Sequence, residues 1–232
     1  MPVSGACPAC GGPLRPWRVV PASDPALGPQ SFSLERCPRC GTAVTAGPAP
    51  PGLHETGAYR PGAPRLHSAA RPVLGLFDRQ RLSLIRALVP PRARLLDVGA
   101  GRGRFVAAAQ AAGYRAAGIE ASERGVAAAR PLGVQVERAR IEEASRPPAS
   151  LEAVTLWHVL EHLDDPGGAL DRLAYWLAPG GVLLAGVPNL SSLQARLGGD
   201  RWYHLDVPRH RVHFTPAGIS TLLRSHGFSV LS

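Results

Sequence analysis

The segment LLDVGAGRG, residues 95–103, ends an apolar run with three glycines at alternate positions, and a helical pattern follows at once. Because glycine has no Cβ atom, such a turn lets the backbone change direction sharply and approach a ligand closely. The first turn of the helix that follows would present free N–H groups to an anionic or polar ligand. The sequence therefore predicts a ligand-binding turn, made by Gly99, Ala100, Gly101 and Gly103, between a strand and a helix.

Short apolar runs alternate with helical patterns beyond this turn, which is typical of βαβ units in a parallel sheet. The runs that we interpret as strands lie at residues 94–98, 115–119, 134–137, 152–157, 181–187 and 228–231. Ser122, Asp165 and Thr215 are expected to cap three of the helices, the last two with proline next in the chain. Asp78 is expected to begin a further helix over residues 79–88. The pattern predicts an α/β fold with a doubly wound, mostly parallel sheet.

Two carboxylates stand at the ends of the first two predicted strands. Asp97 comes just before the glycine turn, and Glu120 follows about 20 residues later, where a carboxylate can hold the two hydroxyls of a ribose. The dinucleotide-binding fingerprint would need a glycine at its sixth position, which is occupied by Arg104. The spacing therefore departs from the dinucleotide-binding fingerprint, with NAD or FAD binding as the alternative interpretation of the turn.

The pattern Asp97-x-Gly99-x-Gly101-x-Gly103 resembles motif I of class I S-adenosylmethionine-dependent methyltransferases, of the type 11 and type 23 groups, and the resemblance covers residues 72–232. It implies a Rossmann-like fold and methyl transfer from S-adenosyl-L-methionine. It also implies that Asp97 and the glycine turn hold the amino-acid end of the cofactor.

Further cofactor contacts are implied by the same resemblance. Glu120 would hold the ribose, Arg140 and Ile141 would lie at the adenine, and Trp157 and His158 would end the fourth strand beside the cofactor. The family's sheet normally finishes with a seventh strand that inserts antiparallel beside the fifth. Because this sequence stops at about the end of the sixth predicted strand, we expect that the final strand is missing and that the sequence is a fragment.

All four cysteines lie in two Cys-x-x-Cys pairs separated by 26 residues. The pairs stand in CPACGG, residues 7–12, and CPRCG, residues 37–41. Two such pairs supply the four thiolates of a tetrahedral structural zinc site, with redox-active dithiols as the alternative. The predicted ligands are Cys7, Cys10, Cys37 and Cys40. The sequence thus predicts a zinc-ribbon module at residues 1–41, a Pro/Gly-rich linker at 42–72, and a methyltransferase domain at 73–232.

A first group of candidate catalytic residues follows the predicted strand at 152–157. His158, Glu161 and His162 would share one face of a helical turn. The segment resembles the E-x-x-E-H segment of ubiquinone-type O-methyltransferases, in which a divalent metal is implied, with His158 in place of the first glutamate. Three interpretations stay open: a structural or cofactor-covering role, a catalytic base supplied by His158 or His162, and a metal site.

A second group lies in RWYHLDVPRHRVHF, residues 201–214, which contains three histidines, an aspartate and three arginines. Loops that follow the strands of such sheets commonly carry functional residues, and histidine titrates near neutral pH. We predict His210 as the base on the substrate side, with His204 and His213 as alternatives. The other interpretation is that these side chains only order the loop.

The charge and the hydropathy of the sequence limit the classes of partner that the protein can bind. The net charge is +9 and every basic residue is arginine, but the arginines are scattered, which favours a solvated surface over a nucleic-acid site. No apolar run reaches the ~18–20 residues of a membrane span. We expect a cytoplasmic enzyme whose acceptor is a small molecule or a glycan or lipid precursor. The alternatives are an RNA or protein methyltransferase that uses the zinc ribbon for recognition, and a non-catalytic binding module.

Overall fold

The computed structural model describes residues 5–50 and 67–231 of the chain, which form two compact units. The first, here the cysteine–histidine unit, comprises Met1–Tyr59, His158–Ala174 and Val187–Ser232, and the second, here the sheet unit, comprises Arg60–Trp157 and Tyr175–Gly186. Each unit has its own sheet and its own apolar core. No helix within the described ranges is long and apolar enough to cross a membrane.

The elements follow one another along the chain as strands, α-helices and short 3-10 helices. The strands are β1 (Arg15–Pro21), β2 (Ser31–Arg36), β3 (Ala43–Thr45), β4 (Arg94–Val98), β5 (Arg115–Glu120), β6 (Val136–Arg138), β7 (Leu151–Trp157), β8 (Leu177–Gly186) and β9 (Val212–His213). The α-helices are α1 (His67–Arg86), α2 (Arg104–Ala111), α3 (Glu123–Ala129), α4 (Pro166–Trp176), α5 (Leu193–Gly198) and α6 (Pro216–Ser225). The 3-10 helices are η1 (Pro25–Leu27), η4 (Arg130–Leu132), η5 (Leu160–His162), η6 (Gly199–Arg201) and η7 (Tyr203–Leu205).

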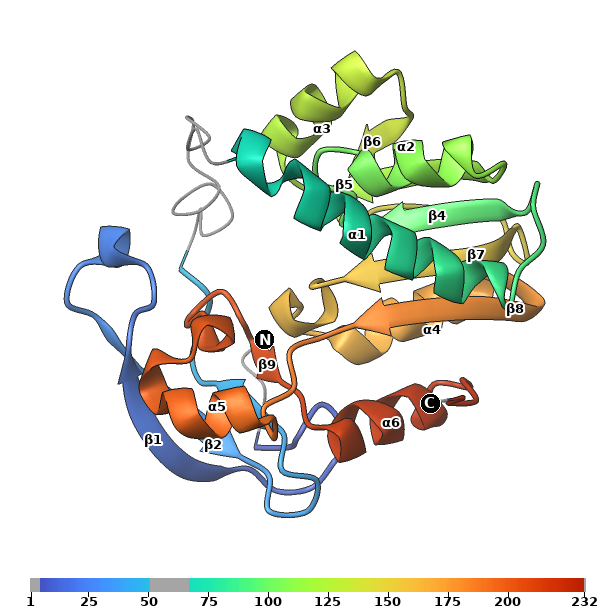
Figure 1. Cartoon of the computed structure of the whole chain (residues 1–232). Helices are drawn as coiled ribbons and strands as arrows, with labels where there is room; N and C mark the ends of the chain where they lie inside the picture. The colour runs from blue at the N-terminus through green and yellow to red at the C-terminus, as the bar shows by residue number, and fades with distance from the viewer. Residues whose placement is uncertain (1–4, 51–66, 232) are drawn as a thin grey trace. The chain divides into compact units, whose positions relative to one another are not determined.

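The sheet unit is built on five parallel strands in the order β6-β5-β4-β7-β8 (Figure 1). Strand β4 lies between β5 and β7, so successive crossovers from it run toward opposite edges of the sheet. In open parallel sheets, ligands bind outside the carboxyl ends of the strands at such a switch point. The predicted α/β fold with a parallel, Rossmann-like sheet is confirmed, and the glycine turn follows the central strand.

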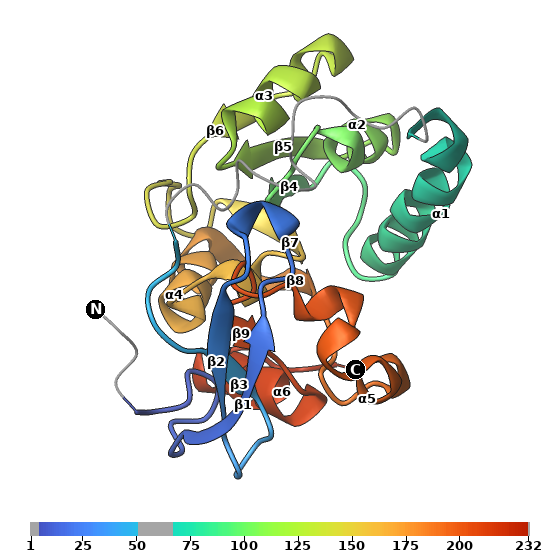
Figure 2. The ribbon, with the colours of Figure 1, turned by 90° about the vertical axis from the view of Figure 1, so that its left-hand side faces the viewer.

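Helices α1 and α2 pack on one face of this sheet, beside β4 and β5 (Figure 2). Leu82 and Ile85, three residues apart on α1, are buried together with Phe105 and Val106 of α2. They join Leu95 of β4 in one apolar cluster. Full burial of such a side chain contributes about 1.5–3 kcal/mol, so this cluster fixes the helix that begins behind the glycine turn.

The predicted helix caps are confirmed. The side-chain oxygens of Ser122, Asp165 and Thr215 each accept a hydrogen bond from the backbone N–H three residues later, at 2.9–3.0 Å. Each bond satisfies one of the N–H groups that a helix start leaves unpaired. The helices that open at these residues are α3, α4 and α6.

Several boundaries differ from the sequence prediction. Helix α1 begins at His67 and not after Asp78, and the Asp78 carboxylate pairs with Arg104 at 2.6 Å instead of capping the helix. Strand β8 begins at Leu177 because that residue pairs with Leu151. The strand predicted at 228–231 is wrong: those residues pair with no described strand. Its apolar alternation suits a strand, but a strand also needs a neighbour to bond with.

The cysteine–histidine unit has a four-stranded antiparallel sheet in the order β1-β2-β3-β9 (Figure 2). Strand β9 comes from residues 201–214, here the histidine-rich segment, and pairs with β3, so that Ala43 faces His213. The core beneath this sheet joins Val20 and Leu34 to residues from the same late part of the chain, among them Trp202 and Leu205. The first strands and the histidine-rich segment therefore fold as one unit.

The predicted linker at 42–72 holds regular structure at both of its described ends. Residues 43–45 form the buried strand β3, and α1 begins at His67. The pairing of β3 with β2 and β9 explains the first difference, because a stretch of only three residues becomes a strand when two neighbours bond to it. Residues 51–66 of the predicted linker lie outside the described residues.

Candidate functional site

The glycine turn after β4 has the backbone that its sequence predicts. Gly99, Gly101 and Gly103 have φ angles of 73°, 52° and 72°, in the left-handed region that glycine adopts without strain. At Gly103 a Cβ atom would lie 2.7 Å from Cγ2 of Val134 and 2.9 Å from Cβ of Ala129, too close for any side chain. The backbone N–H groups of Gly99 and Ala100 donate to the carbonyl of Ile119, at 2.9 and 3.0 Å. The turn is thus fixed against β5.

Asp97 lies on β4 just before this turn and is buried, with 4% of its surface exposed. Its Oδ1 accepts a hydrogen bond from Oγ1 of Thr155, on the neighbouring strand β7, at 2.6 Å. Burial raises the pKa of Asp97 to about 7, although the Thr155 hydrogen bond and the Arg81 guanidinium oppose the shift. Because burial disfavours the charged form, a cation brought close to Asp97 would favour its ionisation.

Glu120 is the last residue of β5, and its carboxylate accepts hydrogen bonds from two turns, the glycine turn and the turn before α3. Its Oε2 accepts from the N–H of Gly101 at 2.8 Å, and its Oε1 accepts from the N–H of Ser122 at 2.8 Å. A carboxylate oxygen has two lone pairs, so each oxygen can still accept a hydroxyl. The structure therefore brings Glu120 to the glycine turn, as the sequence predicts, and leaves it able to accept two ribose hydroxyls.

Arg140 and Ile141 lie in the turn after β6. Arg140 is exposed and its guanidinium lies 3.7 Å from the Glu142 carboxylate, whereas Ile141 is buried. The N–H of Ala139 donates to the carbonyl of Glu120 at 3.1 Å. This bond places the predicted adenine-contacting turn next to the end of β5.

Arg81 is a member of this region that the sequence reasoning missed. It stands on α1, and its guanidinium lies 4.2 Å over the ring of Trp157, the last residue of β7. Burial lowers the pKa of Arg81, while the nearby carboxylates of Asp97 and Asp78 act in the opposite direction. Nε1 of Trp157 is buried and has no hydrogen-bond partner among the described residues. The sequence pointed to Arg81 only as a cationic residue on the predicted helix that precedes the glycine turn.

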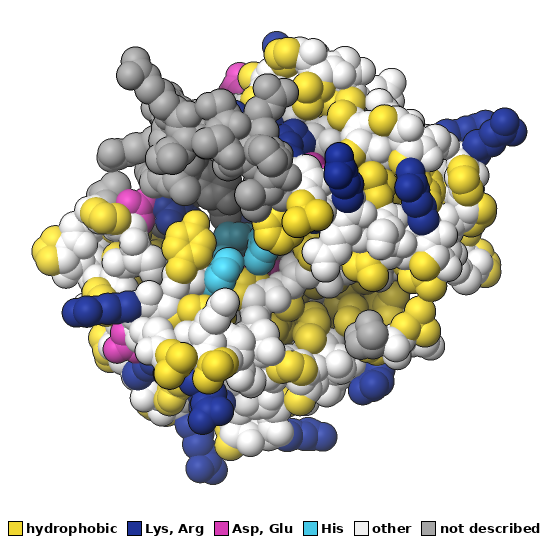
Figure 3. All heavy atoms as spheres, in the orientation of Figure 1, with side chains coloured by type: hydrophobic (Ala, Val, Ile, Leu, Met, Phe, Trp, Pro, Cys, Tyr) yellow, Lys and Arg dark blue, Asp and Glu magenta, His cyan; other side chains and the backbone are white. Residues whose placement is uncertain are grey.

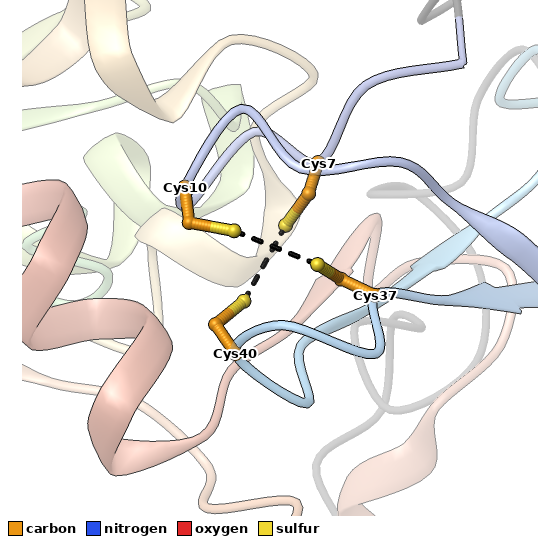
Figure 4. Close-up of side chains that lie close together, drawn as sticks. All are labelled: Cys7, Cys10, Cys37 and Cys40. Carbon is orange, nitrogen blue, oxygen red and sulfur yellow. Dashed lines mark hydrogen bonds between the residues drawn. The ribbon is translucent and has the colours of Figure 1, made fainter.

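The four cysteines converge on a common centre, and their sulfur atoms point toward one another (Figure 4). The Sγ atoms of Cys7 and Cys40 are 3.6 Å apart, those of Cys10 and Cys37 are 3.5 Å apart, and all four lie within 4.8 Å. A tetrahedral zinc ion with Zn–S bonds near 2.3 Å would separate its sulfurs by about 3.8 Å. The predicted clustering is confirmed, and the geometry fits a tetrahedral metal.

The backbone around the cysteines also suits metal-bound thiolates. In each pair the N–H four residues on donates to the carbonyl of the first cysteine, from Gly11 at 2.8 Å and from Gly41 at 2.9 Å. Burial raises the pKa of the Cys37 thiol, but hydrogen bonds from the N–H groups of Cys40 and Arg39 and from neighbouring thiols outweigh burial and bring it to about 7. Donors aimed at sulfur thus stabilise the Cys37 thiolate, whereas burial raises the thiol pKa values of Cys7 and Cys10.

His158 and Glu161 form a hydrogen-bonded pair after β7. Nδ1 of His158 lies 2.9 Å from Oε1 of Glu161, which is 1% exposed, whereas the His158 side chain is 49% exposed. A carboxylate accepts only, so Nδ1 carries the proton and Nε2 is the ring nitrogen that can accept one. His158 has a φ angle of 55°, an uncommon conformation for a residue with a Cβ, and such strain often marks a functional position.

The second histidine group packs beside the first, and histidines gather in one patch on the surface (Figure 3). The ring of His204 stacks on that of His158 with centroids 5.6 Å apart, and the ring of His210 meets that of His162 at 4.7 Å. Ligand atoms of Glu161, His162 and His210 lie within 4.8 Å of one another. Both histidine segments therefore contribute to one cluster, here the histidine cluster.

His210, the residue predicted as the base, lies inside this cluster. It is 5% exposed, and burial lowers its pKa to about 4. Its Nδ1 donates to the carbonyl of His204 at 2.9 Å. Burial likewise lowers the pKa of His213 to about 3, and that of His204 is lowered in the same direction. Among these histidines, His158 has an exposed side chain and a ring nitrogen held by a buried carboxylate.

The chain matches a family model described as a methyltransferase domain over residues 73–232. It is 28% identical to the ubiquinone biosynthesis O-methyltransferase of Xylella fastidiosa (strain 9a5c) over 175 residues, which cover 69% of this chain and 71% of that protein. It is 30% identical to the protein of the same name from Xanthomonas axonopodis pv. citri (strain 306), with 65% and 69% covered.

Solved structures share the fold. One is 1,6-didemethyltoxoflavin-N1-methyltransferase of Burkholderia thailandensis with bound S-adenosylhomocysteine, at 21% identity and a TM-score of 0.54, covering 82% of this chain and 86% of that one. Another is a SAM-dependent methyltransferase of Archaeoglobus fulgidus, at 22% identity and a TM-score of 0.57, covering 67% and 69%.

The parallel sheet, the glycine turn after its central strand and the two carboxylates define the class I S-adenosylmethionine-dependent methyltransferases. With the family match over more than half of its length, the chain belongs to the methyltransferase-domain family and is an S-adenosylmethionine-dependent methyltransferase.

Proposed function

We propose that the chain methylates a hydroxyl oxygen of a small molecule, with His158 as the general base. The observation that carries this proposal is the pairing of His158 with the buried Glu161. The two relatives are both named O-methyltransferases, which supports an oxygen acceptor. The cofactor supplies an electrophilic methyl group on a sulfonium.

The proposed reaction needs one proton acceptor. As the acceptor oxygen forms its bond to the methyl carbon and the carbon–sulfur bond breaks, Nε2 of His158 takes the hydroxyl proton. Glu161 holds Nδ1–H and stabilises the imidazolium that forms. His158 follows Trp157 directly in the chain, so the base stands one residue after the end of β7. The sulfonium charge ends on the imidazolium, and no other proton acceptor is required.

We propose that four side chains and one turn contact the cofactor. Asp97 would accept from its ammonium group and Glu120 from its ribose hydroxyls, while the turn at Arg140 and Ile141 would border the adenine. Arg81 is proposed to bind the carboxylate, because its guanidinium lies over the ring of Trp157, whose buried indole N–H has no hydrogen-bond partner among the described residues. Anion recognition by a guanidinium and a neighbouring N–H donor supports this assignment.

The base is tested by replacing His158 with glutamine. We expect kcat to fall about 10²–10⁴-fold, the usual contribution of a general base, while the dissociation constant of S-adenosylmethionine stays unchanged. The acceptor is sought by screening small phenols, sugar hydroxyls and lipid precursors for S-adenosylhomocysteine release. His226→Gln is the matched control, because His226 also pairs through Nδ1 with a carboxylate, that of Asp171, at the surface. Full turnover by His158→Gln would contradict the assignment.

A metal-assisted form of the same reaction is the second candidate. Glu161, His162 and His210 offer three ligand atoms within 4.8 Å, and Oε2 of Glu161 is buried without a hydrogen-bond partner among the described residues. A divalent cation there would polarise the acceptor oxygen. The two candidates differ in metal content. The metal-assisted form requires one metal ion per chain at Glu161, His162 and His210, in addition to any metal at the cysteines, and His162→Gln should remove it.

We also propose that the four cysteines bind a structural zinc ion. The close approach of all four sulfur atoms and the N–H donors at the Cys37 sulfur support zinc over a dithiol pair. We expect one equivalent of zinc per chain by elemental analysis, lost on Cys37→Ser. A chain purified anaerobically with four reactive thiols and no metal would contradict the proposal.

A further inference from the structure

The second cysteine pair is continuous with the strand that bonds to the histidine-rich segment. The N–H of Cys37 donates to the carbonyl of Thr42 at 2.9 Å, and β3 begins at the next residue. Strand β3 then pairs with β9, so that Ala43 faces His213. Only a few residues therefore separate the proposed metal ligands from the backbone that carries His213.

Thr45, the last residue of β3, contacts two histidines at once. Its Oγ1 donates to the carbonyl of His210 at 2.6 Å and lies 3.0 Å from Nε2 of His213. A hydroxyl has one proton, which is used on His210, so Nε2 of His213 must carry a proton and donate it to Thr45. Thr45 is 3% exposed, so water cannot replace these bonds. One buried hydroxyl thus fixes the backbone of His210 and the tautomer of His213.

The other end of the histidine-rich segment is tied to a cysteine itself. Oγ1 of Thr215 donates to the carbonyl of Cys40 at 2.6 Å and accepts from the N–H of Gly218 at the start of α6. Gly41, in the left-handed conformation, lies against the same threonine. A metal that holds Cys40 in place therefore also holds the residue where the histidine-rich segment enters α6.

The histidine-rich segment in turn supports the pair proposed as catalytic. The N–H of Arg211 donates to the carbonyl of Glu161 at 2.7 Å, and Nδ1 of His162 lies 3.1 Å from the carbonyl of Arg209. His204 stacks on His158 with an interplanar angle of 6°. Contacts thus run without a break from the cysteines through β3 and residues 201–215 to Glu161 and His158, all within the cysteine–histidine unit.

We propose that metal bound by the four cysteines positions the histidine cluster, with Thr45 as the positioning residue, so that metal occupancy controls methyl transfer and leaves cofactor binding intact. The catalytic part of this inference rests on the proposed function of His158. The cofactor residues belong to the sheet unit, which has its own core and shares none of these bonds.

The structural part of the proposal is tested on the whole 232-residue chain by hydrogen exchange before and after complete removal of the metal with a chelator. We expect amide exchange in residues 201–215 to rise about tenfold or more, because the β3–β9 pairing loses its support. The dissociation constant of S-adenosylmethionine, measured by titration calorimetry, should change less than about threefold. Unchanged exchange in residues 201–215, or loss of cofactor binding together with the metal, overturns the proposal.

The role of Thr45 is tested with the metal in place. Thr45→Val keeps the side-chain volume but removes the hydroxyl, and we expect it to retain one equivalent of metal while kcat falls about tenfold at an unchanged KM for the cofactor. The nitrogen chemical shifts of His213 should show that its Nε2 no longer carries the proton, and Thr45→Ser should restore both properties. Thr221→Val is the matched control, because the Thr221 hydroxyl donates to the carbonyl of Ala217 on the exposed side of α6.

Two results separate this proposal from the proposed function. If exchange in residues 201–215 follows metal occupancy but His158→Gln keeps full turnover, the positioning role stands and the assignment of the base fails. If Thr45→Val behaves like Thr221→Val in kcat and in the His213 shifts, the positioning role of Thr45 is wrong whatever His158 does.

Discussion

The two units build their sites from contacts of very different sequence separation. In the sheet unit, the Gly101 N–H and the Glu120 carboxylate that it bonds to are 19 residues apart. In the cysteine–histidine unit, Thr45 bonds to His210 over 165 residues, and Arg209 pairs with Asp24 over 185. The glycine turn and Glu120 therefore lie in one continuous stretch of the sequence. The bonds of Thr45 and Arg209 form only after distant segments of the chain have paired.

The largest effect that would sharpen this contrast is expected from Asp24→Ala. Asp24 and Arg209 are 5% and 6% exposed and form a salt bridge, so removal of the carboxylate leaves a buried guanidinium with less compensation. Such a loss typically costs about 3–5 kcal/mol of unfolding free energy. We expect hydrogen exchange to rise in the cysteine–histidine unit alone.

The matched control for Asp24→Ala is Asp200→Ala. Asp200 also pairs with an arginine, Arg18, but it is 50% exposed, and exposed pairs contribute about 0–1 kcal/mol. If the two variants are equally stable, burial does not govern the Asp24 pair. If Asp24→Ala abolishes cofactor binding, the units are not separable as described.

The counterpart in the sheet unit is Gly103→Ala. The added Cβ would meet Val134 and Ala129 under 3.0 Å, and the φ angle of 72° would also be unfavourable. Overpacking and a left-handed alanine together cost about 2–4 kcal/mol, and we expect cofactor binding to be lost with it. Gly133→Ala isolates the backbone cost, since Gly133 has a φ angle of 67° and open space around its Cβ position. Equal losses in the two variants would show that packing at Gly103 is unimportant.

A pH titration distinguishes the units through their buried groups. The raised pKa of Asp97 stabilises the sheet unit as the pH falls below about 7, whereas the histidines act in the opposite direction, so the two units are followed separately by hydrogen exchange during denaturant unfolding. The folded pKa values of His210 and His213 are lowered by burial to about 4 and about 3, below the usual 6.5. The unfolded chain therefore binds more protons below pH 6.5, so stability falls as the pH drops from about 6.5 toward 4. Between pH 7 and 5.5 each histidine should remove about 1 kcal/mol from the cysteine–histidine unit. Denaturant unfolding at both pH values measures this loss, and a flat profile would contradict it.

The smallest effect is expected from Glu120→Gln. The amide keeps an oxygen that can accept a hydrogen bond but loses the charge and one acceptor, so we expect cofactor affinity to fall about fivefold to tenfold. Titration calorimetry measures it. Glu123→Gln is the control, because Glu123 is an exposed residue paired with Arg138 at 3.2 Å. A loss of the same size in the control would remove the ribose assignment.

The sequence predicted the sheet unit well because its decisive features are local. Alternating patterns located β4, β5 and β7, and the caps at Ser122 and Thr215 followed from chemistry within four residues. The glycine turn and the approach of Glu120 to it needed only the spacing of a strand, a turn and a helix. The clustering of the four cysteines was predictable for a similar reason, since the chemistry of a metal site dictates the pairs.

The rest depended on pairings that no local pattern specifies. Strand β3 was taken as linker because its three residues become a strand only between β2 and β9. The burial of His210, which lowers its pKa, could not be predicted either, because it comes from the packing of segments far apart in the chain. The stacking of Arg81 on Trp157 was likewise missed, because it joins a helix and a strand end through tertiary packing.

The pairing of β3 with β9 has a consequence for the order in which the protein is made. Thr45 and His213 are 168 residues apart, and ribosomes add about 5–20 residues per second, so β3 leaves the ribosome on the order of ten seconds before its partner. During that interval one edge of β3 has no neighbour, and an unpaired edge invites association with other chains. Early capture of a metal ion by the first 40 residues would hold the nascent hairpin folded until the late strand arrives.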